Sequence, residues 1–424
     1  MGKIQLPPNW KLMQLGDLGE IYGGGTPSTK ILKYWDGDIR WLVPSEVTKH
    51  RGIYISDTER HITPEGLQKC ASKLFPSGTV LMTSRATIGE VVINTLPMAT
   101  NQGFINICCD QNKTFNEFLT YWIIQNKQIF KDRANGVTFK EISRSNFKTI
   151  PIYLPPLPEQ KTIAHTLRTI QKAKETRLRE LELERERKAA LMQYLFTFGT
   201  SSSHNKVELQ ETKIGYIPKF WQINQCDHVC EKISVGVVVK PASHYVEKGV
   251  PAFRSLNIRE DRLSTHNLVF FSEEANDTIL IKSKLKTGDV LIVRTGYPGT
   301  SCVVPPEFEG ANCIDIVFAR PKREVVTSEY LSRYFNSPEG KRQALTAKTG
   351  LAQQHLNVNA VQRCLIPIPP LHEQKQITDV LIACDRKIQA LEKEIALTDE
   401  LFHAMLEQLM TGKISTQPLT ETYV

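Results

Sequence analysis

The cysteine and histidine residues near position 228 are the side chains whose spacing best suits a metal ion. Cys226, His228 and Cys230 alternate with single intervening residues, and zinc prefers thiolate sulfur and imidazole nitrogen as ligands. A structural zinc site needs about four such ligands, and no second pair lies near these three in the sequence. We therefore interpret the two cysteines as small core residues and predict no bound metal.

Motifs for chemistry on nucleotides or DNA are missing from the sequence. A phosphate-binding loop requires an earlier glycine and a Gly-Lys-Ser/Thr triplet, and the Gly-Lys pairs at Gly2, Gly340 and Gly412 have neither the earlier glycine nor the hydroxyl. No Pro-Pro pair stands in the Asn/Asp-Pro-Pro-aromatic tetrad of an amino-methyltransferase. The stretch Gly23-Gly-Gly-Thr-Pro27 has no lysine–hydroxyl partner and is interpreted as a tight turn. A Ser-His-Asp or Cys-His triad is left open, but no local signature favours one.

The composition favours a globular, multidomain protein with an anionic partner. At 424 residues the chain is long enough for two or three domains, and 41% hydrophobic residues can bury ordinary cores. Lysine and arginine number 53 against 45 aspartate and glutamate, which gives a net charge of +8. Neutralising phosphates with such charges releases counterions, so the excess suits a polyanion.

Cysteine usage and hydropathy indicate a reduced, cytoplasmic setting. Nine cysteines form an odd number without framework spacing, which argues against a disulfide scaffold. The amino-terminal residues show no apolar segment of signal-peptide length, and no window of about 18 apolar residues occurs. We therefore expect no membrane segment.

The most informative feature is an internal repeat at about half the chain length. Five segments of the first half recur in the same order in the second half, at offsets of 210 to 214 residues. The pairs are residues 6–10 and 217–221, 75–82 and 285–292, 117–123 and 329–335, 135–136 and 349–350, and 154–161 and 368–375. In the last pair, Leu-Pro-Pro-Leu-Pro-Glu-Gln-Lys matches Ile-Pro-Pro-Leu-His-Glu-Gln-Lys. Unrelated segments would not keep this order, so the chain contains two copies of one unit.

Each copy ends in a long helical pattern after its Pro-Pro pair. Pro158 suits a first helical turn, and Glu159 and Glu373 fall where the helix dipole favours an acid. In the second copy, apolar residues recur at alternating spacings of four and three, which is typical of a coiled-coil seam. These seam positions are Ile377, Leu381, Cys384, Ile388, Leu391, Ile395, Thr398, Phe402, Met405 and Leu409.

The first copy keeps the same register but has charges in the middle. Its apolar seam residues are Ile163, Leu167, Ile170, Leu181, Leu191 and Leu195. Its charged seam positions are Lys174, Arg177, Glu184 and Lys188. Such a helix would pack poorly against a copy of itself, so we expect the two helices to pair antiparallel within the chain, as a rod about 60 Å long. The charge run at 177–188 is interpreted as a solvated helix face.

The remaining segments are predicted to form two mixed α/β (α+β) lobes. Strand-like runs occur at residues 39–43, 79–83, 91–93 and 104–109, with counterparts at 290–293 and 314–318, and short helices are expected near 116–126 and 328–336. The predicted organisation is a lobe at 1–155, a helix at 156–199, a linker at 200–212, a lobe at 213–369, a helix at 370–413 and a tail at 414–424. The repeat predicts a pseudo-two-fold arrangement of the two copies.

Several of these segments resemble a known family. Gly23-Gly-Gly-Thr-Pro-Ser28, followed by Tyr34-Trp35 and Ile39-Arg-Trp-Leu42, is similar to the opening of the target-recognition domains in specificity subunits of type I restriction–modification systems. Ser84-Arg-Ala-Thr-Ile-Gly89 with Asn101-Gln-Gly103, and the two Pro-Pro-Leu-x-Glu-Gln-Lys segments, are similar to that family as well. The likeness covers nearly the whole chain. The second lobe departs from it, because residues 233–240 replace the glycine-rich stretch and Arg294-Thr-Gly-Tyr297 replaces Ser84-Arg85.

This resemblance implies a non-catalytic protein that reads DNA. Each lobe would read one half of a bipartite, asymmetric site, and the helices would set the half-sites about one helical turn apart. The helices would also dock two methyltransferase subunits, which flip and methylate adenine with S-adenosylmethionine. Two motor–nuclease subunits that use ATP and magnesium would join that core, and this chain would bind none of these cofactors.

Polar and basic loop residues are the candidates for DNA contact, because their side chains bind bases and phosphates. In the first lobe they are Thr26, Ser28, Lys30, Lys33, Arg85, Asn101, Gln102, Lys140 and Arg144. In the second lobe they are Arg254, Arg259, Arg294, Tyr297, Gln353, Gln354 and His355. Trp35 and Trp41 are interpreted as core residues, and the matched positions of Trp10 and Trp221 indicate a structural role.

Two other functions stay open on the sequence. A duplicated coiled-coil adaptor that binds protein or RNA would show the same repeat and rod. Basic and glutamine-rich segments after residues 136 and 350 favour nucleic acid over protein as the partner. An enzyme with an unrecognised site, such as a metal-dependent nuclease, is the other alternative.

Overall fold

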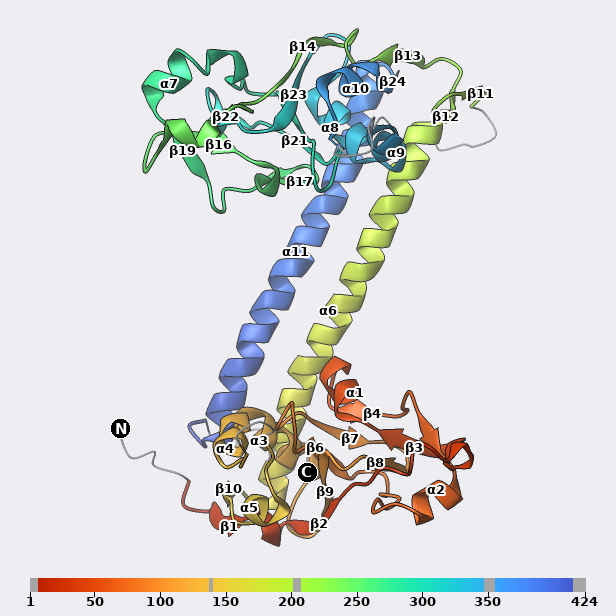
Figure 1. Ribbon diagram of the computed structural model, residues 1–424, viewed down its shortest axis with the longest axis vertical. Helices are drawn as coiled ribbons and strands as arrows, with labels where there is room; N and C mark the ends of the chain where they lie inside the picture. The colour runs from red at the N-terminus through yellow and green to blue at the C-terminus, as the bar shows by residue number, and fades with distance from the viewer. Residues whose placement is uncertain (1–6, 137–139, 201–206, 347–354, 415–424) are drawn as a thin grey trace. The chain divides into compact units, whose positions relative to one another are not determined.

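The chain divides into two units that each hold a core of their own. The computed structural model describes residues 7–136, 140–200, 207–346 and 355–414. One unit runs to Arg179 and resumes at Glu392, and the other spans Glu180–Leu391. The boundary cuts both long helices, so each unit contains one lobe and one end of each helix (Figure 1).

The first lobe contains a five-stranded and a three-stranded sheet, with strand orders β2-β9-β6-β7-β4 and β5-β3-β8. The strands are β2 Gly19–Gly23, β3 Trp35–Leu42, β4 Tyr54–Ile55, β5 His61–Ile62, β6 Val80–Thr83, β7 Val91–Asn94, β8 Met98–Thr100 and β9 Phe104–Cys109. Neighbours are antiparallel, except that β4 with β7 and β3 with β8 are parallel. A separate antiparallel pair, β1 (Lys11–Gln14) with β10 (Pro151–Leu154), joins the two ends of the lobe.

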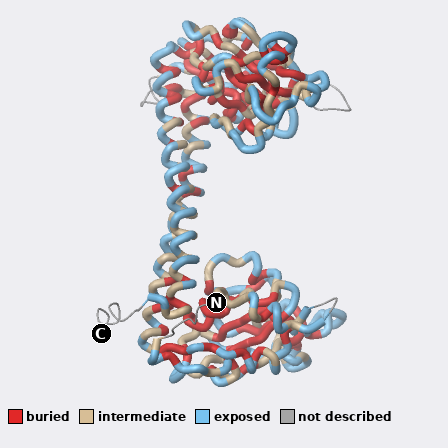
Figure 2. Tube along the Cα trace, turned by 90° about the vertical axis from the view of Figure 1, so that its left-hand side faces the viewer, coloured by how far each residue is buried: buried red, intermediate tan, exposed pale blue. Residues whose placement is uncertain are grey.

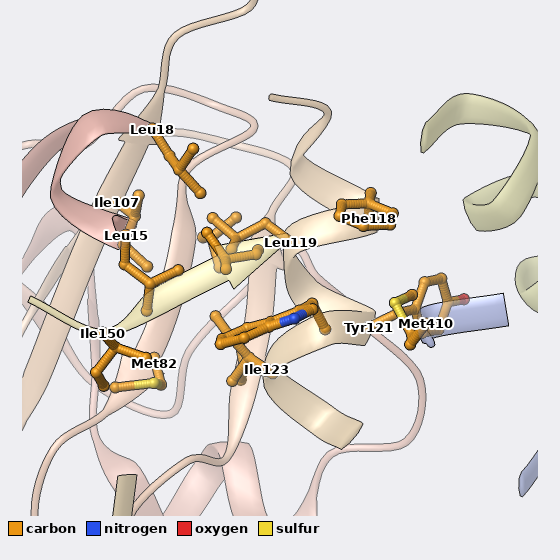
Figure 3. Close-up of a cluster of buried hydrophobic side chains, with 14 of the residues drawn as sticks. Leu15, Leu18, Met82, Ile107, Phe118, Leu119, Tyr121, Ile123, Ile150 and Met410 are labelled. Atoms are coloured by element: carbon orange, nitrogen blue, oxygen red, sulfur yellow. The ribbon is translucent and has the colours of Figure 1, made fainter. Parts of the chain in front are cut away.

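Short helices cover these sheets. They are α1 Pro44–Lys49, α2 Pro64–Gln68, α3 Asn116–Gln125, α4 Lys127–Asp132 and α5 Arg144–Lys148. α3 packs on β6 and β7, and every residue of those two strands is buried. Strands covered on both faces carry continuous apolar runs, which explains Val-Leu-Met-Thr in β6 and Val-Val-Ile-Asn in β7. Figure 3 shows side chains of α3 within this core, with Met410 beside Tyr121 at its edge.

The second lobe repeats this plan. The order β14-β23-β20-β21 corresponds to β2-β9-β6-β7, and β19-β16-β22 corresponds to β5-β3-β8. The strands are β14 Cys230–Val235, β15 Tyr245–Val246, β16 Val250–Phe253, β17 Ile258–Arg259, β18 Arg262–Leu263, β19 Val269–Phe271, β20 Val290–Val293, β21 Ser301–Val303, β22 Asn312–Cys313 and β23 Ile316–Pro321. The helices are α7 Glu273–Asp277, α8 Ser328–Asn336, α9 Pro338–Thr346 and α10 Val358–Arg363. β13 (Gln222–Gln225) pairs with β24 (Leu365–Ile368), as β1 does with β10.

The structure confirms the predicted fold of two repeated α/β lobes with two long helices. The predicted helix at 328–336 coincides with α8, and the predicted strand at 290–293 coincides with β20. The segment predicted as a linker, 200–212, ends in a short strand. Leu209–Thr212 forms β11, which pairs with β12 (Gly215–Pro218), because the Gly215 turn lets the chain fold back on itself.

The two long helices run antiparallel. α6 spans Leu157–Phe198, and α11 spans Leu371–Met410. Ion pairs within each unit join them, among them Lys174 with Asp399, Arg177 with Glu394, Glu184 with Lys387, and Lys188 with Asp385. Within each unit, the later residue of α6 pairs with the earlier residue of α11. The two helices therefore run in opposite directions.

The charged seam residues of α6 face α11, so the interpretation of this run as a solvated face was wrong. The side chains of Glu184 and Lys188 are 4% and 13% exposed, whereas Glu182 and Arg185, which lie off the seam, are exposed. The seam accepts these charges because α11 places an opposite charge beside each of them. Such pairs favour one register and one partner.

The apolar seam positions are all buried or half-buried. Leu167 and Leu409 belong to the core of the first lobe, and Leu195 and Leu381 belong to the core of the second. Each lobe therefore packs on the start of one helix and the end of the other. Figure 2 shows buried residues gathered in each lobe and sparse along the middle of the helices. Among the described residues, no helix is both long and apolar enough to cross a membrane.

The repeated Glu-Gln-Lys triplet joins each lobe to its helix. The Gln160 side chain, which is fully buried, accepts a hydrogen bond from the N–H of Phe115 and donates to the carbonyls of Lys113 and Pro155, all at 2.8–2.9 Å. The same three bonds surround Gln374, whose partners are Thr327, Val325 and Pro369. A buried amide with three satisfied bonds fixes the start of each helix relative to its lobe.

The glutamate of each triplet holds a tryptophan. Nε1 of Trp10 donates to Glu159 at 3.3 Å, and Nε1 of Trp221 donates to Glu373 at 3.0 Å. Both indoles are buried, at 8% and 2% exposure. The structural role predicted for the two tryptophans is confirmed.

We expect the interhelical ion pairs to make helix pairing sensitive to acid. The hydrogen bond from Lys174 lowers the pKa of Asp399 below its ordinary value of 3.8. A lowered folded pKa stabilises the protein above the unfolded pKa, and this stabilisation is lost as the pH falls. Asp399→Asn should cost at most about 0.5 kcal/mol at neutral pH, because the side chain is 42% exposed and solvent screens it. Thermal melting followed by circular dichroism should show the difference from wild type shrinking as the pH falls below 3.8 and through the lowered pKa.

The control for this prediction is Asp379→Asn, since the ion pair of Asp379 is with Lys375 on the same helix rather than with α6. A deficit in Asp399→Asn that persists in acid would contradict the ion-pair explanation.

Candidate nucleic-acid interface

The glycine-rich stretch of the first lobe is a close-packed loop rather than the predicted tight turn. A Cβ on Gly24 would lie 1.9 Å from the carbonyl oxygen of Asn101, and one on Gly25 would lie 2.6 Å from the amide of Ala71. Neither glycine has a positive φ. The glycines are needed because the loop backbone presses against two neighbouring segments, which local sequence could not reveal.

Two tryptophans hold this loop by its carbonyl groups. Nε1 of Trp41 donates to the carbonyl of Gly25 at 2.9 Å, and Nε1 of Trp35 donates to that of Ser28 at 3.1 Å. Their rings meet edge to face, and the Arg60 guanidinium lies 3.7 Å from the Trp35 ring centroid. Both are buried, which confirms them as core residues. Their position fixes the path of the loop.

Four segments of the first lobe meet at this loop. Thr26 donates a short hydrogen bond to the side chain of Gln102, and Oδ1 of Asn101 accepts from Gly103. The amide of Ser84 donates to the carbonyl of Gly103 at 2.7 Å. Gly23 lies against the Arg144 side chain, whose Nε would be 3.7 Å from a Cβ at that glycine. Residues far apart in sequence therefore form one polar, mostly exposed surface.

The predicted DNA-contacting residues of the first lobe fall into two groups. Those gathered at this surface are Thr26, Arg85, Asn101, Gln102 and Arg144. Of the others, Ser28 lies at the end of the loop itself, and Lys30, Lys33 and Lys140 lie outside these contacts; all four are exposed. Lys33 pairs with Glu65 at 2.6 Å. Their DNA contacts stay predictions.

The second lobe builds the corresponding place differently. Gly236 matches Gly24, since a Cβ there would lie 2.2 Å from the carbonyl oxygen of Cys313. The side chain of Arg294 is 16% exposed, pairs with Asp315, and donates to the carbonyl of Leu356 at 3.0 Å. DNA would have to displace Asp315 before both terminal nitrogens of Arg294 could read a base.

The other candidates of the second lobe are spread more widely. Arg259 and Tyr297 line an open pocket of about 690 Å³, and Tyr297 is 82% exposed. Arg254 is held in the lobe by the carbonyl of Asn267 at 2.6 Å. His355 bonds to Thr295 at 2.7 Å. Gln353 and Gln354 lie outside the described residues.

The cysteine cluster is part of the core, as predicted. The sulfur atoms of Cys226 and Cys230 are 3.9 Å apart and buried, and the side chain of His228 is 68% exposed. The hydrogen bond with Cys230 and burial raise the pKa of the Cys226 thiol. Among the described residues, no group of three or more potential ligands is placed to hold a metal ion.

Sequence reasoning missed the residues that hold the candidates in place. Glu141 bonds to Arg85, Asp315 bonds to Arg294, and Arg60 lies over Trp35. The only available signal was an acid within an otherwise basic segment, Lys140-Glu-Ile-Ser-Arg144.

Two lobes share one topology, each has its own buried core, and the first carries a polar loop surface, so the fold is that of a duplicated two-lobe protein. The model of the type I restriction modification DNA specificity domain matches this chain twice, over residues 7–184 and 221–398. The chain therefore belongs to that family.

Curated relatives span the same length. The chain is 27% identical to the type I restriction enzyme MjaIX specificity subunit of Methanocaldococcus jannaschii, over 99% of this chain and 96% of that protein. It is 21% identical to the EcoKI specificity subunit of Escherichia coli K12, over 98% of this chain and 92% of that protein.

Solved structures share the fold. A chain from a study of the assembly and conformational transition of a type I restriction–modification system superposes with a TM-score of 0.61 at 18% identity, covering 97% of this chain and 100% of that one. The S subunit from M. genitalium gives 0.55 at 13% identity, with 96% of each chain covered.

Proposed function

We propose that this chain is the non-catalytic specificity subunit of a type I restriction–modification complex, and that each lobe reads one half of a bipartite, asymmetric DNA site. The observation that carries this proposal is the duplication of the family's recognition domain. In the first lobe, a polar surface assembled from four segments supports it. Hydroxyl, amide and guanidinium groups are those that bind base edges and phosphates.

The antiparallel helices would set the distance between half-sites and dock partner subunits. Two methyltransferase subunits would methylate adenine at N6 with S-adenosylmethionine, and two motor–nuclease subunits would use ATP and magnesium. Exposed leucines on the helices, Leu183 at 58% and Leu397 at 53%, are available for such contacts. In this proposal the chain itself binds none of these cofactors and works in the cytoplasm, where the DNA is.

Deleting the gene should abolish N6-methyladenine at one split motif with a fixed internal gap. Modification is mapped across the genome with and without the gene, in cells shown to express the partner methyltransferase. An unchanged pattern would contradict the proposal and favour the adaptor that binds protein or RNA. For the assembled complex, log affinity for duplex DNA should fall linearly with log salt, by about 0.9 per phosphate neutralised.

A further inference from the structure

A backbone hydrogen bond and an ion pair join the loop Ser84–Gly89 to the segment that leads into α5. The amide of Ile142 donates to the carbonyl of Ser84 at 3.1 Å. Nε of Arg85 lies 2.8 Å from Oε1 of Glu141 in an ion pair, and the two side chains are 46% and 40% exposed. The ion pair therefore lies at the rim of the polar surface, where a duplex can reach it.

The two terminal nitrogens of Arg85 are the part of the side chain that could bind a base. The closest approach to Glu141 is through Nε, and the terminal nitrogens of Arg85 make no hydrogen bond to any residue that the structure describes. Those two nitrogens form a planar fork whose donors match O6 and N7 of guanine. The Glu141 carboxylate beside Nε orients this fork. Its negative charge would repel DNA phosphates, but the charge of Arg85 offsets that repulsion.

The backbone of this loop is strained in a way that supports a binding role. Ala86 has φ of 56° and Gly89 has φ of 88°. The matched residues of the second lobe, Gly296 and Gly299, have φ of 85° and 89°. A left-handed alanine costs about 1 kcal/mol, and such strain concentrates at ligand-binding loops. Both lobes therefore hold the same loop shape, even where the residue disfavours it.

The second lobe has the same backbone hydrogen bond, but different side chains stand at the positions of the ion pair. The amide of Leu356 donates to the carbonyl of Arg294 at 3.1 Å, as Ile142 does to Ser84. At the positions of Arg85 and Glu141 stand Thr295 and His355, which bond to each other at 2.7 Å. A hydroxyl and an imidazole present no fork, so the two lobes offer different chemistry at one position.

We propose that Arg85 reads a guanine in the half-site of the first lobe and that Glu141 is the positioning residue that aims it. This inference rests on the proposed function, since it names the base that one lobe selects. The Thr295–His355 pair gives the second lobe no equivalent preference at its matched base. The exchange of Arg85 and Glu141 for Thr295 and His355 would then make the two half-sites of the target differ at one base.

The test uses the full chain with its methyltransferase subunits and a DNA library randomised in both half-sites, and methylated products are sequenced. Arg85→Lys should still give methylation but lose about ten- to a hundred-fold in preference for guanine at one position of one half-site. Glu141→Ala should weaken the same preference, and Glu141→Gln should restore part of it, because the amide oxygen can still accept from Nε. His355→Ala serves as the matched control and should leave that half-site unchanged.

The outcomes separate the two proposals. If wild type methylates no split motif, the proposed function fails. If wild type does so and Arg85→Lys leaves the guanine preference intact, this inference alone is overturned. An equal loss at both half-sites, with an unchanged melting curve, would assign Arg85 to general phosphate binding and would also overturn it.

Discussion

Replacing Gln374 with alanine should lower the free energy of unfolding of the second lobe by about 3 kcal/mol. The side chain is fully buried and makes three hydrogen bonds, one accepted from Thr327 and two donated to Val325 and Pro369. Alanine removes all three and leaves one amide and two carbonyl groups without a partner in a dry site. Each such group costs about 1–3 kcal/mol, and relaxation or an entering water offsets part of the sum.

Because a chain of two lobes need not unfold in one step, the measurement is hydrogen exchange of β23 and β24 amides in urea. The matched control is Lys375→Ala, one residue along, whose side chain is 74% exposed and pairs with Asp379 on the surface of the same helix. It should cost less than about 0.5 kcal/mol. Gln160→Ala should repeat the large effect in the first lobe. Equally small losses of stability in Gln374→Ala and Lys375→Ala would contradict the role of the buried glutamine in fixing the helix to its lobe.

Arg333→Met should destabilise the second lobe by about 3–5 kcal/mol. The guanidinium is 6% exposed and lies 3.0 Å from Asp261 and 2.5 Å from Asp385 of α11. Asp385 keeps Lys188 as a partner in the variant, but Asp261 loses the guanidinium that pairs with it directly. A buried carboxylate without a counter-charge is the main cost of breaking such a pair.

The pH dependence of this variant gives an independent check. Burial raises the pKa of Asp261 above its ordinary value, and Arg333 opposes that shift. Without Arg333 the pKa should rise further. A carboxyl with a raised folded pKa destabilises the protein when ionised, so the deficit of Arg333→Met should shrink as the pH falls through the new pKa.

The second change Asp261→Asn should recover much of the loss, since it removes the orphaned charge. Arg342→Met is the surface control, because Arg342 is 53% exposed and pairs with Glu339 on the same helix. It should cost less than about 1 kcal/mol. A similar loss of stability in Arg333→Met and Arg342→Met would contradict a larger contribution from the buried ion pairs of Arg333.

The first lobe solves the same packing problem without charge. At the positions of Arg333 and Asp385 it has Tyr121 and Gln171, which form a neutral hydrogen bond of 2.9 Å. The repeat in sequence therefore predicts the place of this contact but not its chemistry, because a neutral pair and an ion pair can fill one site.

The repeat and the periodicity by themselves determined the two lobes, the two long helices and the seam. Those features depend on the order of apolar residues along one segment, which is visible locally. Trp10 and Trp221 were predicted as structural from their matched positions, for the same reason. The family resemblance rested on segments that the family model also covers.

Only the tertiary structure decided what each polar side chain does. The charges of α6 were taken as solvated because their partners lie some 200 residues away on α11. Gly24 and Gly25 were taken as a turn because the backbone that crowds them comes from residues 71 and 101. Arg85 and Arg294 are both loop arginines in the sequence, yet Arg85 is 46% exposed beside Glu141, whereas Arg294 is 16% exposed and bound to Asp315. Apolar burial follows from local pattern, whereas the role of a polar group is set by the partner that folding brings to it.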